Sequence, residues 1–268
     1  MKKITDNVYV GDTFRGCNSS FVVTNEGTVI IDTPMVPAEA KEWRQEVEKH
    51  GEIRYVVNNE FHNDHVAGNC WLGGTLVAHE GIRERIKTNR KEDLEGQMGW
   101  MAPDAVPLDK DFCYRLPDIT FSQEITLYLG NHSFHIITVP GHTPYETAVY
   151  VPEERVVFTS DNVTMGMPIM IDAVPDEWLK SMEVLKTLDV DQIVPGHGPV
   201  CDKAALDITY DNVQYVTKEV EAAIAKGWRV EEVQEKITLA ERFPTGPDDP
   251  MKRMRQESLA GLYRALKK

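Results

Sequence analysis

Residues 60–65 read Glu-Phe-His-Asn-Asp-His, and four of these six side chains are of types that bind metal ions: Glu60, His62, Asp64 and His65. The run follows an apolar stretch, residues 55–57, that predicts a buried strand. It precedes residues 66–69, where a helix can begin. Because alternate side chains of an extended segment point the same way, we expect Glu60, His62 and Asp64 to share one side, with His65 turning in from the helix start.

Three further segments repeat this arrangement of a polar ligand after an apolar run. Residues 140–144 read Pro-Gly-His-Thr-Pro, residues 158–162 read Phe-Thr-Ser-Asp-Asn, and residues 194–198 read Val-Pro-Gly-His-Gly. They place His142, Asp161 and His197 directly after strand-like stretches. Together with the first segment they supply seven ligands, which is enough for two neighbouring metal ions.

Net charge, the lengths of the apolar runs and the spacing of the cysteines limit the substrates and the location that we expect for this chain. The formal net charge of −14 disfavours a nucleic-acid substrate, because such a surface repels phosphates, and a small-molecule substrate is expected instead. No apolar run approaches the ~20 residues of a membrane span, and no apolar stretch follows Lys2 and Lys3, so we expect neither membrane insertion nor a signal peptide and assign the chain to the cytoplasm. The four cysteines form no Cys-x-x-Cys pair, which predicts reduced thiols: Cys17, Cys70, Cys113 and Cys201.

The order of the predicted elements indicates two sheets packed face to face with helices outside. Two groups of strands are separated by helical patterns, and a helical region of residues 206–268 follows. We therefore expect a catalytic domain over residues 1–205, with the helical extension packed on the same domain. The expected strands are residues 8–10, 21–24, 28–32, 55–58, 75–78, 125–129, 134–139, 148–151, 156–159 and 193–194, and the expected helices are 37–50, 178–185, 206–226, 231–241 and 251–266.

Residues 80–118 interrupt this alternation. A polar helical stretch runs into an irregular segment in which Met98 and Trp100 are expected to be exposed. One interpretation is an insertion at the mouth of the active site, and the other is a solvated helix and loop without a catalytic part. A homodimer formed through this segment and the C-terminal helices is a further hypothesis.

The ordered motifs resemble those of the metallo-β-lactamase superfamily, whose pattern is His-x-His-x-Asp-His, a later Gly-His-Thr-Pro, an Asp after a strand and a final Gly-His. The resemblance covers roughly residues 1–200 and implies an α/β fold, an αββα four-layer sandwich. It also implies that Asp32 supports the metal-site loop without binding metal.

By this resemblance, Glu60, His62 and His142 would hold one divalent metal ion, Asp64, His65 and His197 would hold the second, and Asp161 would bridge them. A hydroxide shared by the two ions would attack a small ester, lactone, thioester or amide, since metal binding lowers the pKa of water to around 7. Asp64 would orient this nucleophile or take its proton, so Asp64 and Asp161 are the expected catalytic residues.

The sequence departs from the family pattern at Glu60, where the family usually has His. A carboxylate is a harder ligand than imidazole, so iron and manganese stand beside zinc, the favoured metal. A diiron or iron redox enzyme of the same fold is therefore an alternative, and so is a degenerate member that binds a ligand without catalysis. Glu60 pointing away from the site is a third alternative.

Two other positions bear on activity. Asp161 stands where β-lactamases of the superfamily generally have Cys or Ser, which favours lactonase-like and thioesterase-like hydrolases over antibiotic hydrolysis. Tyr145 follows the Gly-His-Thr-Pro turn, and it would either stabilise an oxyanion or pack behind His142.

Overall fold

The computed structural model describes residues 1–246, 249 and 251–267 and divides the chain into two compact units. The first unit comprises residues 1–138, 145–160 and 189–202. The second comprises residues 139–144 and 161–188 and the described residues from 203 onward. The expectation of a single domain with the extension packed on it stays a prediction.

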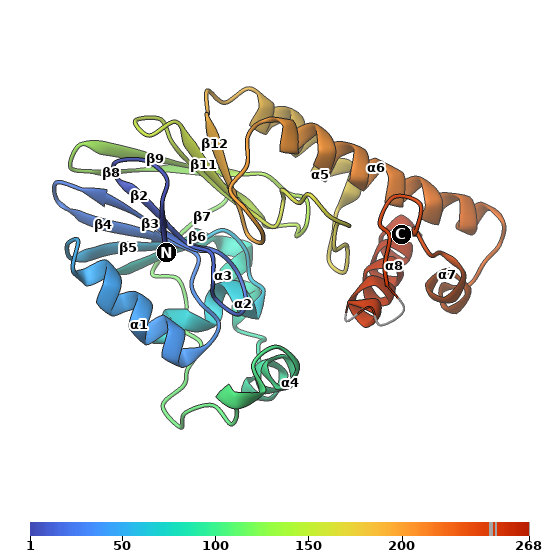
Figure 1. The fold of residues 1–268 in the computed structure, drawn as a ribbon, viewed down its shortest axis with the longest axis horizontal. Helices are drawn as coiled ribbons and strands as arrows, with labels where there is room; N and C mark the ends of the chain where they lie inside the picture. Colours follow the sequence, from blue (N-terminus) through green and yellow to red (C-terminus); the bar gives the residue numbers. More distant parts are fainter. Residues whose placement is uncertain (247–248, 250, 268) are drawn as a thin grey trace. The chain divides into compact units, whose positions relative to one another are not determined.

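Two β-sheets build the first unit (Figure 1). In the part of the chain that the structure describes, one sheet has seven strands in sequence order: β1 (Lys2–Lys3), β2 (Val8–Gly11), β3 (Ser19–Thr24), β4 (Gly27–Ile31), β5 (Ile53–Asn58), β6 (Thr75–His79) and β7 (Ile119–Phe121). The other has five strands in the order β12 (Gln192–Pro195), β11 (Val156–Ser160), β10 (Thr147–Val151), β9 (His132–Thr138) and β8 (Glu124–Leu129). The sequence missed β1 and β7, which are two and three residues long.

The hydrophobic core of the first unit lies between the two sheets. Side chains of the first sheet, such as Val29 and Val57, pack in one buried cluster with side chains of the second, such as Phe134 and Phe158. Helix α1 (Pro37–Glu48) covers the other face of the first sheet, where Trp43 joins a second cluster. The two sheets pack face to face, and a helix covers the outer face of the first sheet. This arrangement confirms the predicted α/β class, in which each layer buries its apolar face against a neighbouring layer.

Parallel pairing brings the motif segments to corresponding strand ends. Strands β4, β5, β6 and β7 are parallel, as are β11 and β12. Asp32 follows β4, and Glu60 comes two residues after β5. His197 likewise comes two residues after β12. The carboxyl ends of parallel strands share one edge of a sheet, which is the usual place for a ligand site in α/β proteins.

The segment 80–118 is more deeply packed than its sequence suggested. It contains α3 (Glu80–Ile86), α4 (Lys91–Met101) and the 3₁₀ turn η2 (Pro103–Ala105). Leu94 and Met98 are fully buried in a cluster with Met35 and Ala67. The expectation that Met98 is exposed was therefore wrong, whereas Trp100 is 53% exposed as predicted.

The second unit is helical. It contains α5 (Pro175–Lys186), α6 (Ala204–Ala225), α7 (Val230–Lys236) and α8 (Lys252–Leu266), and the long α6 contacts α5 and α8 (Figure 1). A stripe of valines on α6, including Val213, Val216 and Val220, is fully buried, as its spacing predicted. Helix α7 ends at Lys236, five residues before the predicted end.

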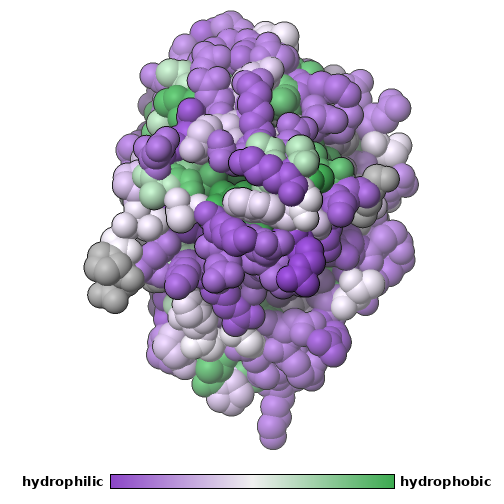
Figure 2. Space-filling view, turned by 90° about the vertical axis from the view of Figure 1, so that its right-hand side faces the viewer, coloured by the Kyte–Doolittle hydropathy of each residue, from purple (hydrophilic) through white to green (hydrophobic). Residues whose placement is uncertain are grey.

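The face of the molecule shown in Figure 2 is mostly hydrophilic, with smaller hydrophobic areas between the hydrophilic ones. The full sequence carries a formal net charge of −14. Within the described residues, every helix is too short or too polar to cross a bilayer.

Candidate metal centre

Residues 60–65, which carry four of the candidate ligands, lead from the end of strand β5 into a short helix. Strand β5 ends at Asn58, and α2 spans Asn63–Val66 with His62 as its extended N-cap. A 3₁₀ turn, η1 (Ala67–Cys70), continues the helix. The prediction that Asp64 lies on an extended segment was wrong, since Asp64 and His65 both lie inside α2. The helix begins three residues earlier than expected because the N-cap turn already forms at His62.

Glu60 is directed at the neighbouring histidines. Its side chain is fully buried. Oxygen Oε2 contacts His62 Nδ1, and Oε1 lies 3.1 Å from His65 Nε2. The alternative that Glu60 points away from the motif therefore does not hold. Burying a carboxylate is costly unless charged or hydrogen-bonding partners surround it, and here imidazoles do so.

A second group of donors forms around Asp64. One ligand atom each from Asp64, His65 and His197 lies within 4.8 Å of the others. Asp64 Oδ2 is 3.3 Å from His197 Nε2 and 3.9 Å from His65 Nε2. The structure thus brings together five of the seven predicted ligands within the first unit.

His65 is held from behind by Asp32. His65 Nδ1 lies 3.1 Å from Asp32 Oδ2 and 3.0 Å from Ser160 Oγ, while the hydroxyl of Ser160 donates to Asp32 Oδ2 at 2.9 Å. The backbone N–H of Asn59 donates to Asp32 Oδ1 at 2.9 Å. A carboxylate only accepts hydrogen bonds, so it fixes the proton on Nδ1 and leaves Nε2 as the electron-pair donor. Asp32 thus supports the ligand loop, as the resemblance implies.

The backbone at these supporting residues is unusual. Asp32 has φ 51° and Ser160 has φ 47°, both in the left-handed region that disfavours side chains other than glycine. Such conformations cost of order 1 kcal/mol and persist where surrounding contacts enforce them. Burial raises the pKa of the Asp32 carboxyl, and the contacts with His65 and Asn59 oppose that shift.

His142 and Asp161 belong to the second unit and form a similar arrangement there. His142 Nε2 lies 3.6 Å from Asp161 Oδ2. The opposite ring nitrogen, Nδ1, donates to the Ile169 carbonyl at 2.8 Å, and the backbone N–H of His142 donates to Asn162 Oδ1 at 2.8 Å. The indole of Trp178 donates to the Asn162 carbonyl at 2.9 Å. His142 is thereby fixed with Nε2 towards a carboxylate, as a ligand histidine requires.

The donor set fits a divalent metal ion. Buried carboxylate oxygens and imidazole nitrogens are ligands of zinc, iron and manganese. In both units a histidine Nδ1 lies against an oxygen acceptor while Nε2 faces carboxylate oxygens. This orientation is the one that holds ligand histidines in metalloproteins.

Ser160 is the supporting residue that sequence reasoning missed. The available signal was its place directly before Asp161 at the end of an apolar run. Its hydroxyl contacts both Asp32 and His65, although β4, which precedes Asp32, and β11, which ends at Ser160, lie in different sheets. Such a contact depends on tertiary structure and leaves no spacing to read.

Tyr145 has a packing contact. Its ring stacks on His79 with centroids 5.4 Å apart and an interplanar angle of 15°. His79 itself caps α3, where its Nδ1 accepts from the backbone N–H of Gly81 at 2.9 Å. The structure therefore gives Tyr145 a structural contact within the first unit, and its proposed part in oxyanion stabilisation stays a prediction.

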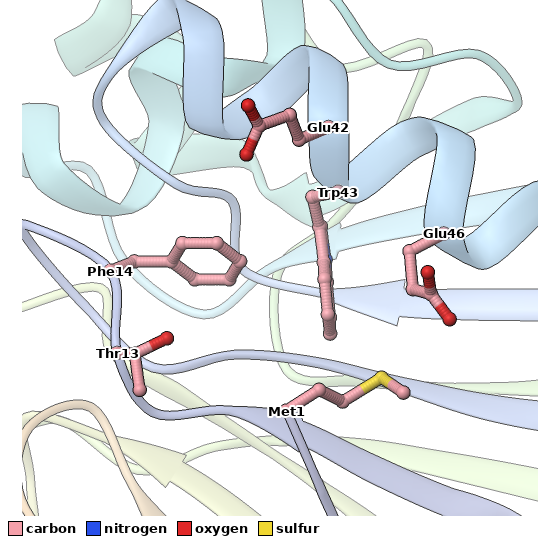
Figure 3. Close-up of a pocket in the computed structure, with 6 residues that line it drawn as sticks. All are labelled: Met1, Thr13, Phe14, Glu42, Trp43 and Glu46. Carbon is pink, nitrogen blue, oxygen red and sulfur yellow. The ribbon is translucent and has the colours of Figure 1, made fainter.

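A pocket of about 330 Å³ lies elsewhere in the first unit. Figure 3 shows Phe14 and Trp43 lining it, with ring centroids 5.2 Å apart, and the carboxylates of Glu42 and Glu46 beside them. None of the candidate ligands lines this pocket, so we assign it no part in the metal chemistry.

Comparison with known proteins identifies the family. The sequence profile of the metallo-beta-lactamase superfamily matches residues 12–197, which includes every candidate ligand. The chain belongs to the metallo-beta-lactamase superfamily. A Beta-lactamase-like protein 2 homolog of Caenorhabditis elegans is 23% identical over 195 residues, which cover 71% of this chain and 59% of the relative. A Linear primary-alkylsulfatase of a Pseudomonas strain is 23% identical over 211 residues, covering 73% of this chain and 39% of the relative.

The chain thus spans less than two thirds of the length of these two relatives. A type 2 metallo-beta-lactamase of Pseudomonas aeruginosa matches more evenly, with 24% identity over 82% of this chain and 86% of that protein.

Solved structures confirm the metallo-beta-lactamase fold. A metallo-beta-lactamase from Pontibacter korlensis superposes with a TM-score of 0.64 at 20% identity, covering 80% of this chain and 97% of that structure. The stereoselective inverting sec-alkylsulfatase Pisa1 from Pseudomonas sp. superposes with a TM-score of 0.75 at 14% identity, covering 98% of this chain and 49% of that structure. At these identities the likeness establishes the fold alone.

Proposed function

We propose that this chain is a metal-dependent hydrolase acting on a small ester, lactone, thioester or amide. The observation that carries the proposal is the buried donor group in the first unit. Glu60 Oε1 lies 3.1 Å from His65 Nε2, and His65 is oriented by Asp32. Membership of a superfamily that includes metallohydrolases adds to this support.

The proposed ligand assignment follows the family pattern. Glu60, His62 and His142 would hold one divalent cation, and Asp64, His65 and His197 would hold the other. Asp161 would bridge the two. Zinc is the favoured metal, with iron and manganese as alternatives because Glu60 supplies a hard oxygen ligand. The support is the order of the seven residues along the chain and the donor chemistry within each unit.

Bound divalent cations would lower the pKa of water and polarise the oxygen of the substrate. The chain's own residues have separate parts. Asp64, whose Oδ2 is 3.3 Å from His197 Nε2, would orient the nucleophile or accept its proton. Asp32 and Ser160 keep His65 in the tautomer that has its proton on Nδ1 and a lone pair on Nε2. Burial of Asp64 and His65 limits the access of bulk water to these donors, which strengthens their electrostatic interactions.

Sulfate esters are a second candidate substrate class. The specific observation is that the alkylsulfatase structure covers 98% of this chain, whereas the lactamase structure covers 80%. The sulfatase match therefore reaches into the C-terminal helices. A sulfate ester, like a carboxylate ester, presents an oxygen that bound cations can polarise.

A small-molecule substrate is supported by the net charge of −14, which disfavours phosphate backbones. We also propose a cytoplasmic location, which is compatible with four free cysteines. The homodimer stays a prediction.

The test is a substrate panel assayed after metal depletion and reloading. Carboxylate esters, lactones, thioesters, amides, β-lactams and alkyl sulfates are compared for wild type, Asp64→Asn and the surface variant Asp104→Asn. We expect metal-dependent turnover of at least one class, a fall of about 10²–10⁴ for Asp64→Asn and wild-type rates for Asp104→Asn. Turnover that is equal with and without metal, or equal in Asp64→Asn, would overturn the proposal.

A further inference from the structure

Two cysteines that are distant in sequence lie next to each other in the first unit. Cys70 and Cys113 are separated by 43 positions, yet their sulfur atoms are 3.5 Å apart. The backbone N–H of Cys113 also donates to Cys70 Sγ at 3.1 Å. Both are free cysteines in the structure, and the separation of their sulfur atoms exceeds a disulfide bond by only about 1.5 Å.

Their positions link the segment 80–118 to the metal-binding turn, residues 60–70, which carries the candidate ligands Glu60, His62, Asp64 and His65. Cys70 is the last residue of η1, which directly continues α2. Cys113 lies in the stretch that returns from η2 to β7. Beside it, the hydroxyl of Tyr114 donates to Asn63 Oδ1, in the first turn of α2, at 2.7 Å. The returning stretch therefore contacts both α2, through Tyr114, and η1, through Cys113.

A neighbouring thiol and the exposure of Cys113 distinguish this pair from the other cysteines. Cys113 is exposed and Cys70 is partly buried, so a dissolved oxidant can reach the pair. Cys17 is buried, with its thiol directed at the Thr33 carbonyl. Cys201 directs its thiol at the Ile193 carbonyl.

We propose that Cys70 and Cys113 form a redox-modification site, at which a peroxide closes a disulfide that ties the segment 106–118 to the metal-binding turn. In the first step the Cys113 sulfur takes an oxygen atom from hydrogen peroxide, giving a sulfenic acid and one water. The Cys70 sulfur then attacks the Cys113 sulfur. The S–S bond forms as the S–O bond breaks, and the hydroxyl leaves with the Cys70 proton as a second water.

Proximity drives the second step. Burial raises the pKa of the Cys70 thiol to about 11, so this sulfur is largely protonated at neutral pH, although the N–H of Cys113 favours its thiolate. An attacking group held 3.5 Å from its target needs only a small fraction in the reactive form, because the reaction is intramolecular. The oxidised state would constrain a long loop that contains α3 and α4.

The test uses the full chain, oxidised with hydrogen peroxide and compared with protein kept in a thiol-free phosphine reductant. We expect both thiols to be lost together, a linked peptide pair containing residues 70 and 113, and a rise in melting temperature of roughly 5–10 °C that dithiothreitol reverses. Cys70→Ser and Cys113→Ser should each abolish the linked peptides and the rise. The matched variant Cys201→Ser should retain both.

Folding of the variants is checked by comparing their reduced forms with reduced wild type. Cys113→Ala serves as a second variant, because the Cys113 side chain is exposed and its truncation should disturb the packing little. The proposal is overturned if peroxide leaves Cys113 as a sulfenic or sulfinic acid without the intramolecular link. A link formed only between separate molecules would overturn it equally.

Discussion

Replacing Asp32 by Asn tests the orientation of His65 while keeping the size of the side chain. The amide oxygen can still accept from the backbone N–H of Asn59, which lies 2.9 Å from Oδ1. The amide nitrogen then takes the place of Oδ2, 3.1 Å from His65 Nδ1. A donor at that position forces Nδ1 to accept, so the ring proton moves to Nε2, which lies 3.1 Å from Glu60 Oε1. A protonated Nε2 has no lone pair for a metal.

The expected loss is a 10–100-fold weaker affinity for zinc, or about 1.4–2.8 kcal/mol. Asp32→Ala should cost more in folding, because it removes an acceptor shared by the Asn59 N–H, the Ser160 hydroxyl and His65 Nδ1. Only Ser160 and His65 can still pair with each other, and each buried donor left without an acceptor costs about 1–3 kcal/mol. Zinc affinity is measured by competition with a chromogenic chelator, and stability by urea unfolding of metal-free protein. Asp6→Asn is the control, since its side chain is 99% exposed. An Asp32→Asn variant that binds zinc as tightly as wild type would refute the tautomer argument.

Three further predictions concern stability. Gly68→Ala should lower the free energy of unfolding by about 1–3 kcal/mol, because the added Cβ would overlap a backbone carbonyl oxygen. The Cβ added in Gly73→Ala meets open space, so this control should change the free energy of unfolding little. Equal effects of the two variants in urea unfolding would contradict the prediction. Met98→Ala should lower the free energy of unfolding by about 2–5 kcal/mol, and Trp100→Ala by less than about 1 kcal/mol, because the two side chains are 0% and 53% exposed. A larger loss of stability for Trp100→Ala than for Met98→Ala would show that α4 is not packed as described. Burial opposes ionisation of Glu154, but hydrogen bonds from three neighbours outweigh this effect and hold its pKa below the ordinary 4.5. The contribution of Glu154 to folding stability is therefore present above pH 4.5 and is lost as the pH falls through the lower folded-state pKa. Glu154→Gln should flatten the acid side of the curve of stability against pH, and an unchanged acid side would contradict the assignment.

Local patterns predicted the strands that carry the motifs and the positions of the ligands after them. Each strand in question is a short apolar run with a turn behind it, and such runs are readable from sequence. The start of α2 was misplaced because Asp64 and His65, although polar, already lie within its single turn. Helix boundaries of this kind depend on the N-cap conformation of His62, which spacing does not reveal.

Contacts between distant segments could not be predicted. Ser160 approaches His65 from 95 positions away, and Cys113 approaches Cys70 from 43 positions away. Met98 was expected to be exposed because it was assigned to an irregular segment that follows a polar helix, yet α4 buries it against residues of the first unit. These contacts arise from tertiary packing, which a single sequence specifies only through the whole fold.

Metal content per chain is the measurement that bears most directly on the proposed centre. Protein purified without chelators is examined by elemental analysis, for wild type and for variants lacking His65 or Asp161. We expect about two divalent ions per wild-type chain and a clear loss in both variants. Wild-type protein with substoichiometric metal that no supplement restores, or variants with unchanged metal content, would contradict it.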